Sequence, residues 1–126
     1  MTLPHSLDAK TSGDDAERIA ERYLTQRGLK LVARNYHCRY GEIDLIMQHA
    51  DALVFVEVKL RKTPSGRVNF GGALASITPS KQAKLIATAQ HYLAGLKQLP
   101  PCRFDAMLLN GLTLKDVEWL RNAFEA

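Results

Sequence analysis

The amino-acid sequence predicts an α/β protein with a single domain, in which helices flank a mixed β-sheet. Three observations indicate this class: an amphipathic helix pattern near the N-terminus, two apolar strand patterns joined by a short turn, and a long helix pattern that separates them from a later strand. The expected order is therefore helix, three strands, helix, strand, and one further strand near the C-terminus is left open. A chain of 126 residues is long enough for one core only.

The first helix is expected after a flexible tail at residues 1–11, so that the domain spans residues 12–126. Ser12-Gly13-Asp14-Asp15 has the spacing of a helix N-cap followed three residues later by an acid. Gly28 is placed to end the helix, and residues 29–36 suit a first strand. Apolar residues recur before Gly28 at helical spacing: Ala16, Ile19, Ala20, Tyr23 and Leu24.

Two apolar segments, residues 41–47 and 53–60, predict the next two strands. Only a few residues lie between them, so we expect the pair to form a hairpin. Thr78-Pro79 is a cap followed by proline at the first helical position, which predicts the start of a long helix. Residues 103–109 predict a further strand, and residues 112–120 are the candidate for the optional last one.

Composition and charge exclude several classes of protein. Apolar residues make up 46% of the chain and charged residues 24%, which excludes general disorder. No apolar run approaches the roughly 20 residues that cross a bilayer, and the N-terminus lacks the pattern of a secretory signal. Two distant cysteines form neither a disulfide scaffold nor a paired zinc site, so a cytoplasmic location is expected. The net charge of +4 permits an anionic partner without demanding one.

The hairpin pattern brings three carboxylates and one ammonium group together. If the turn is centred between residues 50 and 51, Asp44 lies opposite Glu57 and Glu42 lies opposite Lys59, all on one face of the sheet. Like charges opposed at about 5 Å destabilise a sheet. A divalent cation bound by the carboxylate oxygens would remove that repulsion. The alternative is a surface charge cluster in which Lys59 pairs with Glu42, which leaves Asp44 and Glu57 unexplained.

These two strands carry a resemblance to a known superfamily. Gly41-Glu42-Ile43-Asp44-Leu45-Ile46, followed by Phe55-Val56-Glu57-Val58-Lys59, is similar to the PD-(D/E)xK nuclease signature, although Ile43 stands where proline is often found. More narrowly, residues 13–124 resemble the YraN (UPF0102) family of small bacterial proteins. Further family-like features are Asn35, Arg103-Phe104-Asp105 and Asn122-Ala123-Phe124. The resemblance implies a restriction-endonuclease-like fold, similar to that of archaeal Holliday junction resolvases.

The resemblance also implies roles for individual residues. Asp44 and Glu57 would bind Mg²⁺ or Mn²⁺, with the backbone carbonyl of Val58 as a further ligand. Lys59 would orient the attacking water or stabilise the pentavalent phosphate, and Glu17 matches an acidic residue that such resolvases place near the metal. A carboxylate-bound metal and a nearby ammonium group supply the charges that phosphodiester hydrolysis needs.

Two of the candidate catalytic residues have a second interpretation. Glu17 lies at the edge of the apolar stripe of the first helix, so it either points along the helix–sheet seam toward the patch or is an ordinary boundary glutamate in solvent. Gln82 lies inside the apolar arc of the second long helix, where a buried amide needs partners. It either hydrogen-bonds a metal-bound water or a phosphate, or it is a polar residue at the rim of the core.

The segment that follows Lys59 is expected to be a mobile basic loop over residues 61–76, because it is rich in glycine and has no strand or helix pattern. Arg61, Lys62 and Arg67 would contact the phosphate backbone of a nucleic acid. Phe70 would stack on a base or pack on a second subunit, which leaves a homodimer open. The alternative is a solvated connection with incidental charge.

The combined expectation is a metal-dependent endonuclease that hydrolyses phosphodiester bonds in DNA, with branched or structured DNA among its candidate substrates. Two alternatives come from other classes: a non-catalytic nucleic-acid-binding module on the same fold, and a protein-interaction module in which the charge patch is incidental. The intact set of Asp44, Glu57 and Lys59 favours the enzyme, because a non-cutting relative is free to lose any of the three.

Overall fold

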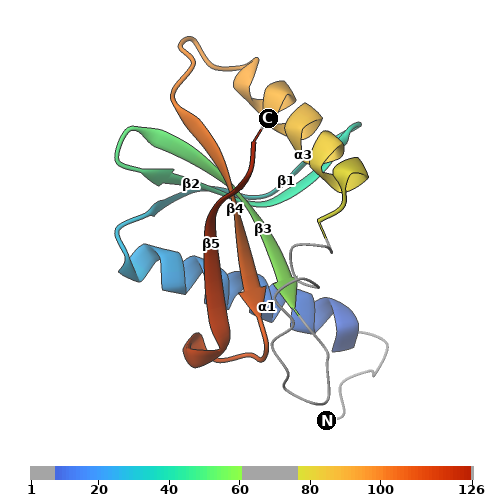
Figure 1. Ribbon diagram of the computed structural model, residues 1–126, viewed down its shortest axis with the longest axis vertical. Helices are drawn as coiled ribbons and strands as arrows, with labels where there is room; N and C mark the ends of the chain where they lie inside the picture. Colours follow the sequence, from blue (N-terminus) through green and yellow to red (C-terminus); the bar gives the residue numbers. More distant parts are fainter. Residues whose placement is uncertain (1–7, 61–76, 126) are drawn as a thin grey trace.

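The computed structural model describes residues 8–60 and 77–125, with side chains from Gly13 onward (Figure 1). The described elements are α1 (Asp8–Gln26), β1 (Lys30–Cys38), β2 (Gly41–His49), β3 (Ala52–Leu60), α3 (Pro79–Leu93), β4 (Cys102–Leu109), a short 3₁₀ turn η2 (Leu114–Asp116) and β5 (Val117–Phe124). They confirm the α/β class and its expected order. The optional last strand is present as β5.

The five strands form one mixed sheet in which spatial order follows chain order, β1-β2-β3-β4-β5. Neighbouring strands are antiparallel, except β3 and β4, which run parallel because α3 carries the chain back across the sheet. Where β2 and β3 pair, the register is the predicted one, from Leu45 opposite Val56 to His49 opposite Ala52. The pairing does not extend to the predicted pairs Asp44–Glu57 and Glu42–Lys59. Within the described residues, no helix is long and apolar enough to span a membrane.

Each helix covers one face of the sheet, and the buried residues form one core on either side (Figure 1). Burial of these apolar faces is the main force that holds the three layers together. The α1 side buries Ala16, Ala20, Leu24, Leu29, Leu45, Met47, Val54, Val56, Met107 and Leu109. The α3 side buries Ile43, Ile46, Leu53, Phe55, Ile77, Leu85, Ala89, Phe104 and Ala106.

The start of α1 corrects one prediction. The helix begins at Asp8, so Ser12 lies inside it and does not cap it, and residues 8–11 are not part of a tail. Helical hydrogen bonding continues through Gly13, although glycine costs about 1 kcal/mol of helix propensity relative to alanine. Gly28 ends the helix as predicted, with φ of 94°.

The last strand also begins later than predicted. Residues 114–116 form η2, because the Asp116 carboxylate accepts hydrogen bonds from the backbone N and the hydroxyl of Thr113. This local side-chain pairing competes with strand formation. The strand β5 therefore covers Val117–Phe124 and extends past the predicted end at Leu120.

Asp105 explains two of the family-like motifs in structural terms. Its side chain is buried on β4 and accepts hydrogen bonds from Arg103 Nε, Trp119 Nε1 and the backbone N of Asn122. The Asn122 backbone adopts a left-handed conformation, with φ of 53°, which turns this N–H toward the carboxylate. Asp105 is thus a structural acceptor that joins β4 to β5.

Candidate active site

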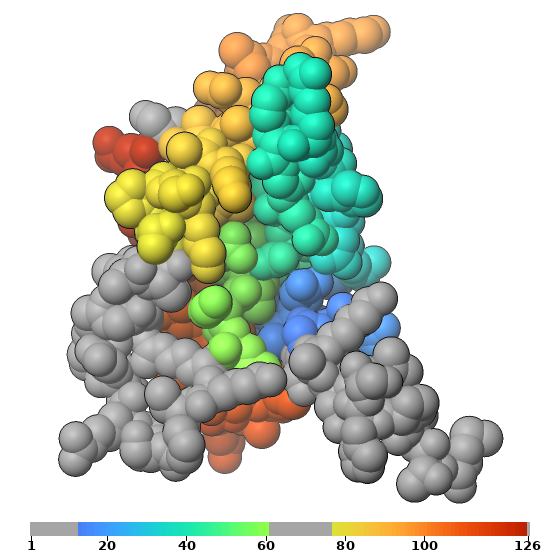
Figure 2. Space-filling view, turned by 90° about the vertical axis from the view of Figure 1, so that its right-hand side faces the viewer, coloured from blue at the N-terminus to red at the C-terminus, as the bar shows by residue number. Residues whose placement is uncertain are grey.

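The site begins where β2 and β3 separate. Backbone pairing between the two strands ends at Leu45 and Val56. One residue further on, Asp44 Oδ2 accepts a hydrogen bond of 2.8 Å from the backbone N of Val58. The side chain thus replaces the backbone carbonyl that would accept this hydrogen bond in a continuous pair of strands. The strands diverge here and expose the end of β3 between the start of α3, the β1–β2 hairpin and α1 (Figure 2).

Three carboxylates converge at this divergence. Asp44 lies within hydrogen-bonding reach of both Glu57 on β3 and Glu17 on α1. Burial and then the charge of Asp44 raise the pKa of Glu57 to about 8. Burial and the charges of Asp44, Asp14 and Glu42 raise the pKa of Glu17 to about 7. Of the two sequence interpretations of Glu17, this placement favours the side chain that points toward the patch.

Two lysines offset part of this negative charge. Lys81 and Lys59 both lower the pKa of Glu57, and the effect of Lys81 is the larger. Lys59 was expected at the site from the E-x-K pattern. Lys81 was not, because its position depends on how the first turn of α3 docks against β3. The signal in the sequence was its place two residues after Pro79, in the first turn of the helix that follows the E-x-K strand.

The remaining candidates have mixed outcomes. Gln82 Nε2 donates to the carbonyl of Ile77, 3.0 Å away, so its amide is used at the start of α3 as the structural interpretation expects. Glu42 is exposed and does not pair with Lys59; the ion pairs among described residues are Arg34–Glu21 and Arg103–Asp105. The predicted nucleic-acid contacts Arg61, Lys62 and Arg67 lie outside the described residues.

Asn35 is a neighbour of the site that the sequence reasoning did not assign. Its backbone is left-handed, with φ of 51°, a conformation that asparagine tolerates better than most residues. On β1 it lies between Arg34, which pairs with Leu45, and Tyr36, which pairs with Ile43, and so it is level with Asp44. Asn35 and Glu17 both line a hollow of about 160 Å³. The amide is therefore placed to contact whatever approaches the carboxylates from the α1 side.

The donor set suits a hard divalent cation, although the described part of the chain contains no group of three or more His, Cys, Asp or Glu side chains arranged to enclose a metal. Mg²⁺ is commonly held by one or two carboxylates, and water and substrate phosphate complete its coordination. Asp44 and Glu57 meet that requirement, and burial together with the charge of Asp44 raises the pKa of Glu57 despite Lys81 and Lys59, so the site has room for more positive charge. A bound cation would supply it.

Together, the fold and the site define an α/β protein with an acidic centre where two central strands of its sheet separate. Residues 16–109 match the sequence model of the uncharacterised protein family UPF0102. The chain is 52% identical over 117 residues to a UPF0102 protein of Nitrosomonas europaea, a match that covers 93% of this chain and 96% of the relative. It is 53% identical over 116 residues to one of Nitrosospira multiformis, which covers 92% and 94%. The protein belongs to the UPF0102 family.

Proposed function

We propose that this protein is a metal-dependent endonuclease that hydrolyses phosphodiester bonds in DNA, with branched or structured DNA as the candidate substrate class. The observation that carries the proposal is the convergence of Glu17, Asp44 and Glu57, with Lys59 and Lys81 beside them. Desolvated acids with strongly shifted pKa values are typical of functional sites. The E-x-K pattern on β3 supports the same assignment.

Each side chain has a task in this reaction. Asp44 Oδ2 is fixed by the backbone N–H of Val58, and the carboxylate lies within reach of both Glu57 and Glu17. Asp44 and Glu57 would hold Mg²⁺ or Mn²⁺, which when bound stabilises the charge that develops on the phosphate. Lys59 places an ammonium group beside Glu57, where it stabilises the same charge. With a pKa of about 7, Glu17 is able to take up or release a proton near neutral pH.

The experiment is a cleavage assay with Mn²⁺ or Mg²⁺ on matched single-stranded, duplex and four-way-junction DNAs. We expect cleavage by the wild type and its loss in Asp44→Asn, Glu57→Gln and Lys59→Ala. Lys59→Ala should retain most of its DNA affinity, because the lysine acts mainly in the transition state. Lys97→Ala is a matched control for the lysine, since Lys97 is exposed beyond the C-terminal end of α3.

Two results would contradict the proposal. Wild-type protein that binds these DNAs and cuts none of them with either metal would support a binding module. Wild-type protein that neither binds nor cuts would leave a protein-interaction module as the better interpretation. A Lys59→Ala protein that cuts at the wild-type rate would remove Lys59 from the mechanism and leave the carboxylates in place.

A further inference from the structure

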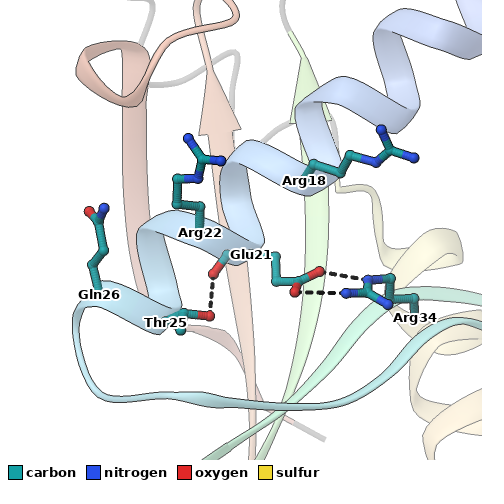
Figure 3. Close-up of a pocket in the computed structure, with 6 residues that line it drawn as sticks. All are labelled: Arg18, Glu21, Arg22, Thr25, Gln26 and Arg34. Carbon is teal, nitrogen blue, oxygen red and sulfur yellow. Dashed lines mark hydrogen bonds and ion pairs between the residues drawn. The ribbon is translucent and has the colours of Figure 1, made fainter.

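A second hollow adjoins the one beside the carboxylates. It has a volume of about 620 Å³, and the described residues that line it are polar or charged and come from α1 and β1 (Figure 3): Arg18, Glu21, Arg22, Thr25, Gln26 and Arg34. The smaller hollow, which reaches Glu17 and Asn35, shares Arg18, Glu21 and Arg34 with it. The two therefore form one groove along α1, which reaches the carboxylate site at Glu17, where Asp14 also lines it; we refer to it as the α1 groove.

Arg34 is held in place across the α1 groove. Its Nε and Nη2 atoms donate to the two carboxylate oxygens of Glu21 at 2.7 and 3.0 Å (Figure 3). A guanidinium group has five N–H donors, so this fork leaves further donors of Arg34 for another ligand. The side chain is 58% exposed, so a ligand can reach it. Less freedom is lost on binding when the side chain is already fixed.

Arg18 and Arg22 add two more guanidinium groups. They lie one helical turn apart on α1, about 6 Å along its axis, and extend from the same side of the helix (Figure 3). Neither makes an ion pair with another described residue. Among the described residues, the larger hollow is thus lined by three arginines and one glutamate, with Thr25 and Gln26 as neutral hydrogen-bonding groups.

We infer that the α1 groove binds the sugar–phosphate backbone of DNA that enters or leaves the carboxylate site. The inference rests on the proposed function, because the groove reaches Glu17, one of the proposed catalytic residues. Arginine is suited to this task, since its planar fork matches the oxygens of a phosphate. Phosphate contacts fix the position of the nucleic acid without reading its sequence. The α1 groove would therefore position the substrate strand and confer no base specificity.

The test compares DNA binding by full-length protein and the Arg18→Ala/Arg22→Ala double variant, measured by fluorescence anisotropy on labelled four-way junction, duplex and single-stranded DNA. Binding is measured in EDTA, and again with Mg²⁺ in an Asp44→Asn background. The matched control is Lys97→Ala/Arg121→Ala, which removes the same charge from residues that line neither hollow. Arg34 is left unchanged, because its removal would also release Glu21. Thermal unfolding checks that each variant is folded.

We expect the groove variant to bind about 3- to 30-fold more weakly than the control, with the same loss on unrelated sequences. Its plot of log affinity against log salt concentration should be shallower by about 1.4 to 1.8, which corresponds to two lost phosphate contacts. A salt slope and affinity equal to those of the control would overturn the inference. The inference would also be overturned if a poly-aspartate peptide binds the wild type as tightly as DNA does and loses as much affinity in the groove variant. The occupant would then be an acidic protein.

The outcomes separate this inference from the proposed function. If wild-type protein binds DNA through Arg18 and Arg22 but never cuts it, the α1 groove stands and the nuclease assignment fails. If wild-type protein cuts DNA while the double variant binds normally, the nuclease assignment stands and the groove fails. If the wild type binds no DNA under either condition, both are wrong.

Discussion

The carboxylate of Asp44 accepts a hydrogen bond of 2.8 Å from the backbone N–H of Val58, directly after the last backbone pair between β2 and β3. This side chain therefore satisfies a donor that the diverging strand leaves open, and it does so with the charge that perturbs Glu17 and Glu57. One residue thus both ends the ladder and sets the electrostatics of the site.

The first prediction separates these two roles. Asp44→Asn keeps an oxygen that can accept from Val58 N–H but removes the negative charge. We expect the pKa of Glu57 to fall from about 8 toward its ordinary value, with burial left as the main cause of the remaining shift. Carboxyl ¹³C chemical shifts of Glu57, followed over pH in wild type and variant, measure this. An unchanged pKa would show that Asp44 does not act on Glu57.

The second prediction concerns the pH dependence of stability. Glu17 and Glu57 have raised pKa values of about 7 and 8 in the folded protein, against 4.5 without these effects. Between about pH 5 and pH 8 the folded state holds more protons than the unfolded chain, so these groups lower the free energy of unfolding as pH rises. Urea unfolding at several pH values should show this decline, and Glu57→Gln should make it shallower. Equal slopes in wild type and variant would contradict the assignment.

The third prediction is stabilisation by metal. At pH 9, above the pKa values of about 7 and 8 for Glu17 and Glu57, both acids are largely ionised, and a divalent cation that binds only the folded state should stabilise it. With a Kd of roughly 1 mM, 10 mM Mg²⁺ adds about 1.4 kcal/mol, or about 3–7 °C in Tm. Asp44→Asn and Glu57→Gln should lose this shift. Glu118→Gln on β5 removes a carboxylate that is not part of the site and should retain it. A shift that survives in all three variants would place the metal elsewhere.

The fourth prediction concerns Asp105, whose buried carboxylate accepts from Arg103, Trp119 and Asn122. Asp105→Ala leaves these donors without their partner and a guanidinium group that is mostly buried. We expect a loss of about 3–5 kcal/mol in the free energy of unfolding. Trp119→Phe, which removes one donor only, should lose about 1–2 kcal/mol. Chemical denaturation measures both, and a smaller loss for Asp105→Ala than for Trp119→Phe would exclude this role.

The hairpin and its carboxylates could be predicted from the sequence because they depend on local rules. Side chains alternate with a period of two, so a short turn at residues 50–51 fixes the register that places Asp44 near Glu57. Lys81 and the α1 groove could not be predicted in the same way. Lys81 reaches Glu57 only through the docking of α3, and Arg34 meets Glu21 only when α1 packs beside β1. These contacts depend on tertiary packing, which periodicity does not specify.

The register of the hairpin has a consequence for the order of folding. Asp44 and Glu57 are close in the chain, and their strands can pair as soon as the turn forms, whereas Glu17 joins them only when α1 docks. Contacts made between distant parts of the chain tend to form late. Most of the repulsion that involves Glu17 should then arise after the folding transition state. Glu17→Gln should therefore slow unfolding and leave the refolding rate almost unchanged, as stopped-flow kinetics can show.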